Sequence, residues 1–492
     1  MFQRALNRVS EFSWVLLLLL LPLTSLPLMS KLVGSAMVMP PSGALLFVLV
    51  VIWLLPGLAR RMTLPPQSKP LLLFVGVALL SSLLAYLLPF PLFRDVSFTR
   101  HTLEAGLTLA VGVCMFLVTS GYPQDQKALK RSLGWINWGG MFIILWSLLQ
   151  AVEWRTTQNY PDWMVTVQSY LSVSGPLFFA DRVTGFAFEP SWLAHQLNML
   201  YLPLWLSASV QSVSAHRLRV WGITIENLLL AGGLAVLWLS LSRVGLVSTL
   251  LMVGFLLLKA NLWLVNWIKR WIQARQKSVV YTLNASRILS VILLFTLLLF
   301  YLALILGVGV MVSKADSRMA TLFDFQALQQ GNFMVYANQL VIAERVVFWQ
   351  TGWDVFNDYP LLGVGLGNTG YFFPDKMIPF GWGLIEVNHL IFAEDGVPNT
   401  KSMWSRLLSE TGLVGFAVFL CWFLVMWATG GSLQRRRSPA SPLVRVFGLA
   451  GQLAVLAFLV EGFSIDSFAL PYLWVTLGLA ASAWRIRRQS EP

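Results

Sequence analysis

Long apolar runs alternate with short polar segments over most of the chain. A helix of about 20 apolar residues spans the hydrocarbon core of a bilayer, and about twelve runs approach that length. They lie near residues 14–33, 43–60, 70–90, 103–121, 134–153, 191–212, 221–241, 243–259, 288–312, 411–430, 444–461 and 466–485. The pattern predicts an all-α integral membrane protein of about twelve transmembrane helices, forming one polytopic domain over residues 1–492.

The longest segment between apolar runs covers residues 313–405. It is rich in Gly, Pro, Asn and Trp, and it carries more acidic than basic side chains. We expect it to form a large loop outside the membrane that contains short helices. A second such loop is expected at 154–190, on the same side.

Charge and composition indicate the class of protein and its orientation in the membrane. The chain is 57% hydrophobic and only 12% charged, which excludes an ordinary soluble domain. Its formal net charge of +13 comes from Lys and Arg on short connections, at both termini and in segment 259–287. In a membrane protein such residues mark the cytoplasmic side and do not indicate nucleic-acid binding. Both termini are therefore predicted to be cytoplasmic, with segment 313–405 on the outer face. The two cysteines lie in apolar runs and cannot build a disulfide framework or a metal site.

One arginine interrupts the apolar stretch 228–259. Two spanning helices must share residues 221–259, so the turn between them is short and Arg243 falls at that turn, on the outer side. A charge within lipid is costly. Arg243 can reach up to the outer head groups, or it can bind an anion at the rim of a cavity. The stretch alone favours neither interpretation.

Three more outer stretches carry charged residues close to apolar runs. The first, 181–197, places Arg182 before Glu189 and Pro190, and a proline is well tolerated in the first turn of a helix. A salt bridge between Arg182 and Glu189 or Asp181 is the alternative to a binding role. The second, 344–373, opens with Arg345. It ends in a Gly-x-Gly-x-Gly pattern, whose backbone N–H groups could approach an anion closely. The third, 399–420, leads into a spanning helix.

Taken together, these stretches resemble the O-antigen ligase and O-antigen polymerase superfamily of bacterial envelope glycosyltransferases. The resemblance covers about residues 180–430 and rests on the order and spacing of short motifs. They are Arg182, Gly185, Phe186 and Pro190; Ser242-Arg243; Arg345 and Trp349; Pro360, Gly363, Gly365 and Gly367; and Glu410-Thr411-Gly412.

The resemblance implies a glycosyltransferase of the bacterial cytoplasmic (inner) membrane that needs no metal and no cofactor. It implies that glycan is transferred from an undecaprenyl-diphosphate-linked donor to an acceptor glycan or glycolipid, by ligation or by polymerisation. A chain-length regulator is a further possible partner. The leaving diphosphate requires positive charge, and guanidinium groups bind phosphate oxygens in pairs. We therefore predict that Arg182, Arg243 and Arg345 bind the diphosphate.

The chain departs from the family at one position. Ligases place a histidine about nine residues before the Glu of Glu-Thr-Gly, and here that position is Lys401. A lysine is a poor general base unless its pKa is strongly lowered. Candidates for the catalytic group are His389, Glu189 and Lys401 itself, although Lys401 also suits an anion ligand and His389 also suits a solvated loop.

Two other classes of protein compete with the enzyme. A transporter or flippase of lipid-linked oligosaccharides would also have many spans and buried arginines, but it would place polar groups at mid-membrane along a path. A membrane scaffold would have no use for clustered arginines. Convergence of the three arginines at one place would favour the enzyme.

Overall fold

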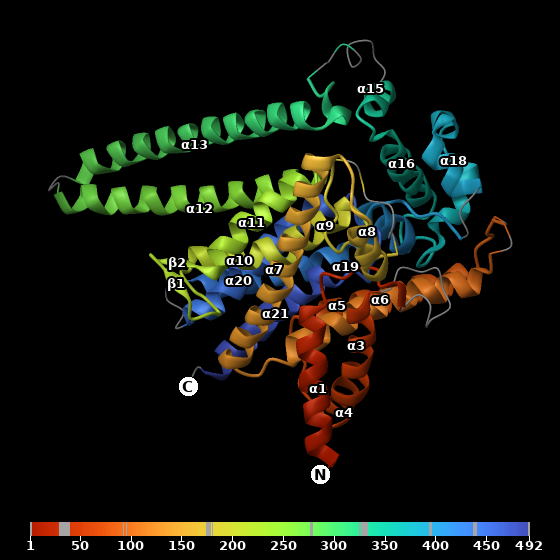
Figure 1. The fold of residues 1–492 in the computed structure, drawn as a ribbon, viewed down its shortest axis with the longest axis horizontal. Helices are drawn as coiled ribbons and strands as arrows, with labels where there is room; N and C mark the ends of the chain where they lie inside the picture. The colour runs from red at the N-terminus through yellow and green to blue at the C-terminus, as the bar shows by residue number, and fades with distance from the viewer. Residues whose placement is uncertain are drawn as a thin grey trace. The chain divides into compact units, whose positions relative to one another are not determined.

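The computed structural model describes residues 2–28, 40–91, 93–94, 96–173, 179, 181–275, 279–323, 326, 333–392, 396–435 and 440–490. The chain forms two compact units (Figure 1): unit 1 contains residues 1–245 and 344–492, and unit 2 contains residues 246–343. Elements within the described residues are helical, except for a short antiparallel pair formed by β1 (Arg219–Val220) and β2 (Ile223–Thr224).

The N-terminal part of unit 1 is a series of apolar helices joined by short connections. They are α1 (Phe2–Leu19), α3 (Pro41–Leu49) continued by η1 (Val50–Leu54) and α4 (Leu55–Ala59), α5 (Ser68–Ala85), α6 (Phe98–Gly121), α7 (Gln126–Thr157), α8 (Asp162–Leu171), α9 (Pro190–Gln196) continued by η2 (Leu197–Tyr201) and α10 (Leu202–Val210), and α11 (Ile225–Leu239).

The C-terminal part of unit 1 has short helices followed by three long ones. They are α16 (Ala343–Asp358), whose first residue belongs to unit 2, η4 (Asn368–Phe372), α17 (Phe373–Lys376), η5 (Pro379–Gly383), α18 (Ile385–Phe392), α19 (Met403–Gln434), α20 (Pro442–Glu461) and α21 (Pro471–Gln489). Unit 2 contains most of α12 (Arg243–Arg275), together with α13 (Val279–Ala315), η3 (Ser317–Met319) and α15 (Phe333–Gln339).

The core of unit 1 is built around α20 and α21. Helix α20 packs on α10, α19 and α21, while α21 packs on α6. A helix that is apolar on all sides belongs in such a central position. Small residues allow close approach: a Cβ at Gly478 of α21 would lie 1.8 Å from the Thr119 Oγ1 of α6. The packed helices α20 and α21 therefore support the loops at the ends of the helices around them.

Eight helices of the described chain are long and apolar enough to cross a membrane, and α11 is a shorter apolar helix. Each predicted apolar run overlaps a helix, but α1 ends at Leu19, well before the end of the predicted run 14–33, and the run 221–241 includes β2 before α11. The all-α membrane fold is thus confirmed, whereas the count of about twelve spans stays a prediction. Segment 313–405 contains the expected short helices, but its side of the membrane also stays a prediction.

The basic segment that begins at residue 259 is helical up to Arg275. Helix α12 continues through it to Arg275, because Leu, Trp, Lys and Arg fill residues 255–275 without a glycine or proline to break the helix. The segment from 276 to 278 lies outside the described residues.

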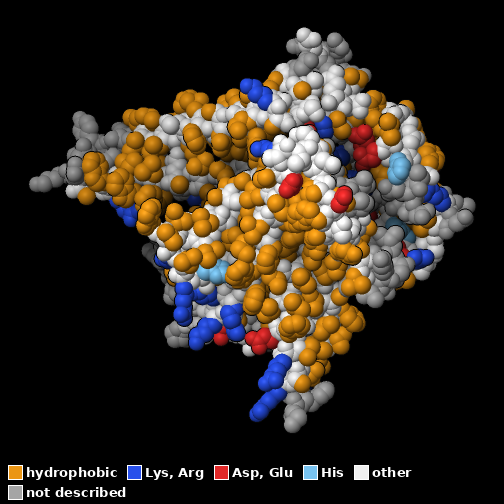
Figure 2. Space-filling view, viewed as in Figure 1, with side chains coloured by type: hydrophobic (Ala, Val, Ile, Leu, Met, Phe, Trp, Pro, Cys, Tyr) orange, Lys and Arg blue, Asp and Glu red, His pale blue; other side chains and the backbone are white. Residues whose placement is uncertain are grey.

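Basic side chains gather at one end of unit 1. Figure 2 shows them near the two termini, below a broad hydrophobic surface. The helix ends there include the first turn of α7, with Lys127 and Lys130, and the last turn of α21, with Arg487 and Arg488. This distribution agrees with the charge pattern of the sequence.

Candidate functional site

Arg243 opens a helix directly after a three-residue turn. Helix α11 ends at Leu239 and α12 begins at Arg243, so the predicted short turn is confirmed. Leu241 has a positive φ of 47°, which reverses the chain. The Oγ of Ser242 accepts a hydrogen bond from Gly245 N at 3.4 Å and caps α12. Arg243 is half-buried at this position.

Arg182 lies against the same turn. Its Nε donates to the carbonyl oxygen of Ser240 at 2.9 Å, and Val183 N donates to Leu239 O at 3.2 Å. The segment is tied to α7 as well, because Gln150 Oε1 accepts from the backbone N of Gly185 at 3.0 Å. The structure thus brings Arg182 and the turn that leads into Arg243 together.

The segment after Arg182 leads into α9 through Glu189. Glu189 is the N-cap residue, Pro190 occupies the first helical position as predicted, and the Glu189 carboxylate accepts a hydrogen bond from Ser191. Near the start of the segment, Tyr160 is buried beside Asp181. Burial, with a smaller contribution from the Asp181 charge, raises the pKa of Tyr160 to about 12.

A buried polar cluster lies next to these elements and consists of His195, Asn198 and Glu461. His195 Nδ1 donates to Glu461 Oε2 at 2.5 Å, and Asn198 Nδ2 donates to Glu461 Oε1 at 2.6 Å. The same Asn198 amide donates to Gly245 O, in the first turn of α12, at 2.8 Å. All three side chains are at most 1% exposed. The cluster therefore connects α9, η2, the first turn of α12 and the end of α20.

Arg345 joins this cluster from α16. Its Nη1 donates to Ser464 Oγ at 3.0 Å, and Ser464 N donates to the backbone oxygen of Glu461 at 2.8 Å. The elements that carry Arg182, Arg243 and Arg345 are thus linked through the Glu461 cluster and the 240–242 turn. These contacts link the segments that carry the three arginines, and the binding role of the arginines stays a prediction.

Lys401 lies beside the same loop, and His389 does not. Lys401 is half-buried with a positive φ of 51°. The next residue, Ser402, caps α19 and donates to Gly462 O at 3.2 Å, two residues before Ser464. His389 is exposed on α18, which packs on η5. The contacts that link the three arginines do not extend to it.

A second buried charged pair holds the other side of the 462–468 loop. Arg406 Nε donates to Glu410 Oε1 at 2.8 Å, and Arg406 Nη1 donates to the backbone oxygen of Asp466. Arg406 is 7% exposed and Glu410 is 1% exposed. A guanidinium in this position fixes the loop that carries Ser464.

The glycine pattern supports the backbone and does not provide a free anion cradle. Gly363, Gly365 and Gly367 all have positive φ values, between 68° and 83°. The N–H groups of residues 363–366 already donate to oxygens within the protein, among them Glu410 O, which accepts from Gly365 N at 2.9 Å. A Cβ at Gly363 would lie 2.4 Å from the backbone oxygen of Ser409. The glycines therefore let this segment lie directly on α19.

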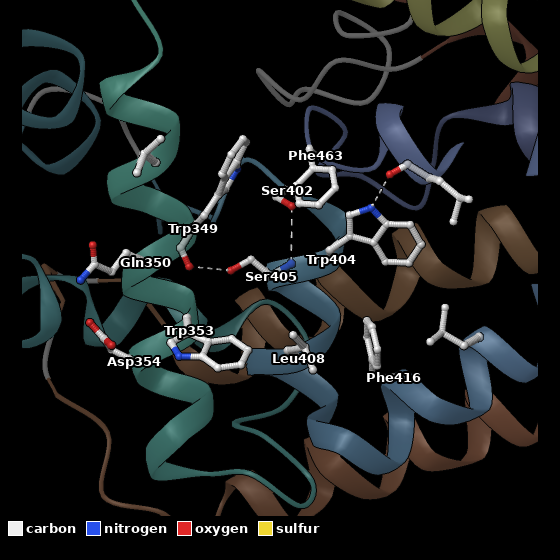
Figure 3. Close-up of a pocket in the computed structure, with 13 residues that line it drawn as sticks. Trp349, Gln350, Trp353, Asp354, Ser402, Trp404, Ser405, Leu408, Phe416 and Phe463 are labelled. Atoms are coloured by element: carbon white, nitrogen blue, oxygen red, sulfur yellow. Dashed lines mark hydrogen bonds between the residues drawn. The ribbon is translucent and has the colours of Figure 1, made fainter. Parts of the chain in front are cut away.

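A cavity of about 740 Å³ opens between α16 and α19 (Figure 3). Its wall is mainly apolar and aromatic, and its lining includes Trp349, Trp353, Trp404, Phe416 and Phe463. Arg345 precedes Trp349 by one helical turn, and its partner Ser464 directly follows Phe463. Arg345 and its partner Ser464 are thus close in the chain to residues that line the cavity.

The comparison with protein families agrees with the motifs. Residues 228–420 match the model of a family described as O-antigen ligase, and the match includes Arg243, Arg345, Lys401 and Glu410. With its apolar helices, the chain is a multi-pass membrane protein, and residues 228–420 are similar to this family of glycan ligases. The resemblance to the O-antigen ligase and polymerase superfamily is confirmed over this region. The chain has no significant match among curated proteins.

Sequence reasoning missed the central carboxylate of the cluster. Glu461 is the single acid in the apolar run 444–461, and His195 lies in another apolar run. An ionisable residue in a spanning segment is costly and usually functional. That rule could have selected both residues before their contact was known.

Proposed function

We propose that this protein transfers or polymerises glycan from an undecaprenyl-diphosphate-linked donor onto an acceptor glycan or glycolipid, at the outer face of the bacterial cytoplasmic membrane. Arg182, Arg243 and Arg345 bind the diphosphate, and the reaction needs no metal. The observation that carries the proposal is the linkage of the three arginine-bearing elements through one buried polar cluster, within and beside the O-antigen ligase region.

The chemistry of the leaving group explains why arginines are needed. When the glycosidic bond to the diphosphate breaks, negative charge grows on the phosphate oxygens. Fixed guanidinium groups in a half-buried site stabilise this charge more than they would in water. Arg243 and Arg345 are both half-buried, so their charges are only partly screened by solvent.

The apolar cavity fits the lipid part of the donor. Its aromatic wall begins one turn from Arg345, so a lipid with its diphosphate on Arg345 would extend its isoprenoid chain along α16 and α19. Such an amphipathic ligand enters sideways from the bilayer. This arrangement supports a lipid-linked donor over a water-soluble nucleotide sugar.

The acceptor hydroxyl must lose a proton, and two of the three sequence candidates lie near the arginines. Glu189 caps α9 just after the Arg182 segment, and Lys401 lies beside the loop that binds Arg345. We propose Glu189 as the general base, because a half-buried carboxylate can accept a proton whereas a charged lysine cannot. Lys401 then acts as a further anion ligand, and His389 stays an untested candidate.

Replacement of single arginines tests the proposal. The wild-type gene is replaced by Arg243→Ala or Arg345→Ala, and the envelope glycans and lipid-linked precursors are analysed together with the amount of inserted protein. We expect long-chain polysaccharide to disappear and lipid-linked precursor to accumulate. Arg155→Ala is the matched control, because Arg155 is an exposed arginine at the end of α7 on the predicted outer side. Unchanged polysaccharide in both test variants would refute the diphosphate-binding role.

The same experiment separates the two types of transfer. Single repeat units on the acceptor would indicate lost polymerisation, whereas long chains left on the lipid carrier would indicate lost ligation. A transporter of lipid-linked oligosaccharides is the alternative, and it predicts precursor trapped on the cytoplasmic side. The linkage of the arginines at one cluster favours the enzyme.

A further inference from the structure

We propose that Glu461 is a positioning residue that sets the spacing of the diphosphate-binding arginines. The inference rests on the proposed function, since it concerns the same site. Glu461 is the last residue of α20 and is fully buried. Its two carboxylate oxygens are each engaged by a different neighbour, and its backbone oxygen by a third.

Two of the hydrogen-bonding groups of Glu461 connect it to the segments that carry Arg243 and Arg345. Through Asn198 the carboxylate reaches Gly245 O, which lies two residues after Arg243 in the first turn of α12. Through its backbone oxygen, Glu461 holds Ser464 N at 2.8 Å, and Ser464 Oγ accepts from Arg345. Glu461 therefore connects the segments that carry Arg243 and Arg345.

The third group, carboxylate Oε2, contacts α9, the helix that follows Arg182 and Glu189. His195 Nδ1 donates to Glu461 Oε2 at 2.5 Å. Helix α9 packs tightly on the first turn of α12, because a Cβ at Gly245 would lie 2.7 Å from the Ala194 Cβ. Glu461 therefore connects to α9 through His195, beside the place where Ala194 of α9 contacts Gly245.

The burial of this carboxylate argues for a specific purpose. A buried carboxylate contributes little net stability even when it is paired, and apolar replacements are often as stable. A purely structural helix contact in an apolar bundle does not require it. A diphosphate site requires arginines fixed to within a fraction of an ångström, and a misplacement of about 1 Å can cost about a hundredfold in rate.

A matched control exists within the chain. Glu226 is also fully buried, and it accepts hydrogen bonds from Asn137 Nδ2 and Ala215 N, both at 2.8 Å. It lies in the first turn of α11, whereas the 240–242 turn follows the other end of that helix, about 21 Å away along its axis. Glu226→Gln therefore perturbs a similar buried carboxylate that lies far from the arginines.

The test measures binding of inorganic pyrophosphate to the purified full-length protein by calorimetry, together with thermal stability. Glutamine replaces one of the two carboxylate oxygens by an NH₂ group, which donates and cannot accept, so the contact of either His195 or Asn198 at that position is lost. We expect Glu461→Gln to weaken pyrophosphate binding at least about tenfold, and Asn198→Ala to do the same. Glu226→Gln should bind like the wild type while its melting temperature falls by a similar amount.

Failure of this inference differs from failure of the proposed function. If Glu461→Gln and Asn198→Ala bind pyrophosphate as tightly as the wild type, or if Glu226→Gln loses as much affinity, the positioning role is wrong. If Glu461→Gln does not fold, Asn198→Ala decides by the same criterion. If the wild type binds pyrophosphate no better than Arg345→Ala does, the diphosphate site itself is refuted.

Discussion

Replacement of Gly412 by alanine should destabilise the protein more than most single changes. Gly412 lies within α19 at φ 63° and ψ −171°, a conformation that is open essentially only to glycine. An alanine Cβ there would lie 2.3 Å from both the carbonyl carbon and the carbonyl oxygen of Leu361, which are backbone atoms that cannot rotate away.

The magnitude follows from two contributions. The backbone strain costs about 1–3 kcal/mol, and the displacement of packed backbone costs about 1–3 kcal/mol more. The free energy of unfolding should therefore fall by about 2–6 kcal/mol, a large part of the 5–15 kcal/mol typical of a folded protein. Since Gly412 belongs to the Glu-Thr-Gly motif, transfer activity should fall with the amount of folded protein.

Thermal unfolding of the purified variants, followed by fluorescence-detected size exclusion, measures this loss. Gly76→Ala is the control, because nothing lies within 4 Å of the Cβ it would add on α5. That variant should be as stable as the wild type or more stable by up to about 1 kcal/mol. A Gly412→Ala protein that melts within about two degrees of the wild type would refute the reasoning.

Three further predictions concern burial, charge and metal. Because the pKa of Tyr160 is raised to about 12, its contribution to stability is complete below pH 10 and is lost as the pH rises from about 10 to 12. Tyr160→Phe should lose less stability across that window in pH-dependent unfolding, and equal losses would contradict this prediction. Arg406→Ala leaves Glu410 buried without its partner and should cost about 3–5 kcal/mol, whereas the double variant Arg406→Met, Glu410→Leu should unfold at a higher temperature than the single one. If the proposed arginines stabilise the leaving diphosphate in place of a metal ion, transfer by the purified protein should survive treatment with EDTA; loss of activity that added Mg²⁺ restores would overturn the metal-free mechanism.

Features that depend on local length and composition could be predicted from the sequence. The turn before Arg243 follows from the space that two helices need within 221–259, and Pro190 at the start of α9 follows from the geometry of proline. The helix at the basic residues 259–275 follows from Trp263, Trp267 and Trp271, which recur every fourth residue. Positive charge marks only a membrane side, so it does not show that this helix continues the apolar run before it.

Contacts between distant segments could not be predicted. His195 and Glu461 are 266 residues apart, and neither run shows by itself that its polar residue has a partner. The glycine pattern is ambiguous for a similar reason. Gly363 and Gly365 suit an anion or a close backbone contact equally well, and only the neighbouring Ser409 and Glu410 backbone shows which one occurs.

The pairing of segment 360–365 with the kinked part of α19 has a consequence for how such an enzyme can diverge. Val364 N and Gly365 N donate to the backbone oxygens of Ser409 and Glu410, while Leu413 N and Val414 N donate to Pro360 O and Leu361 O. These bonds are independent of side-chain identity as long as the glycines remain. Mutations elsewhere in the loop can therefore change the side chains that it presents while its backbone stays attached to α19.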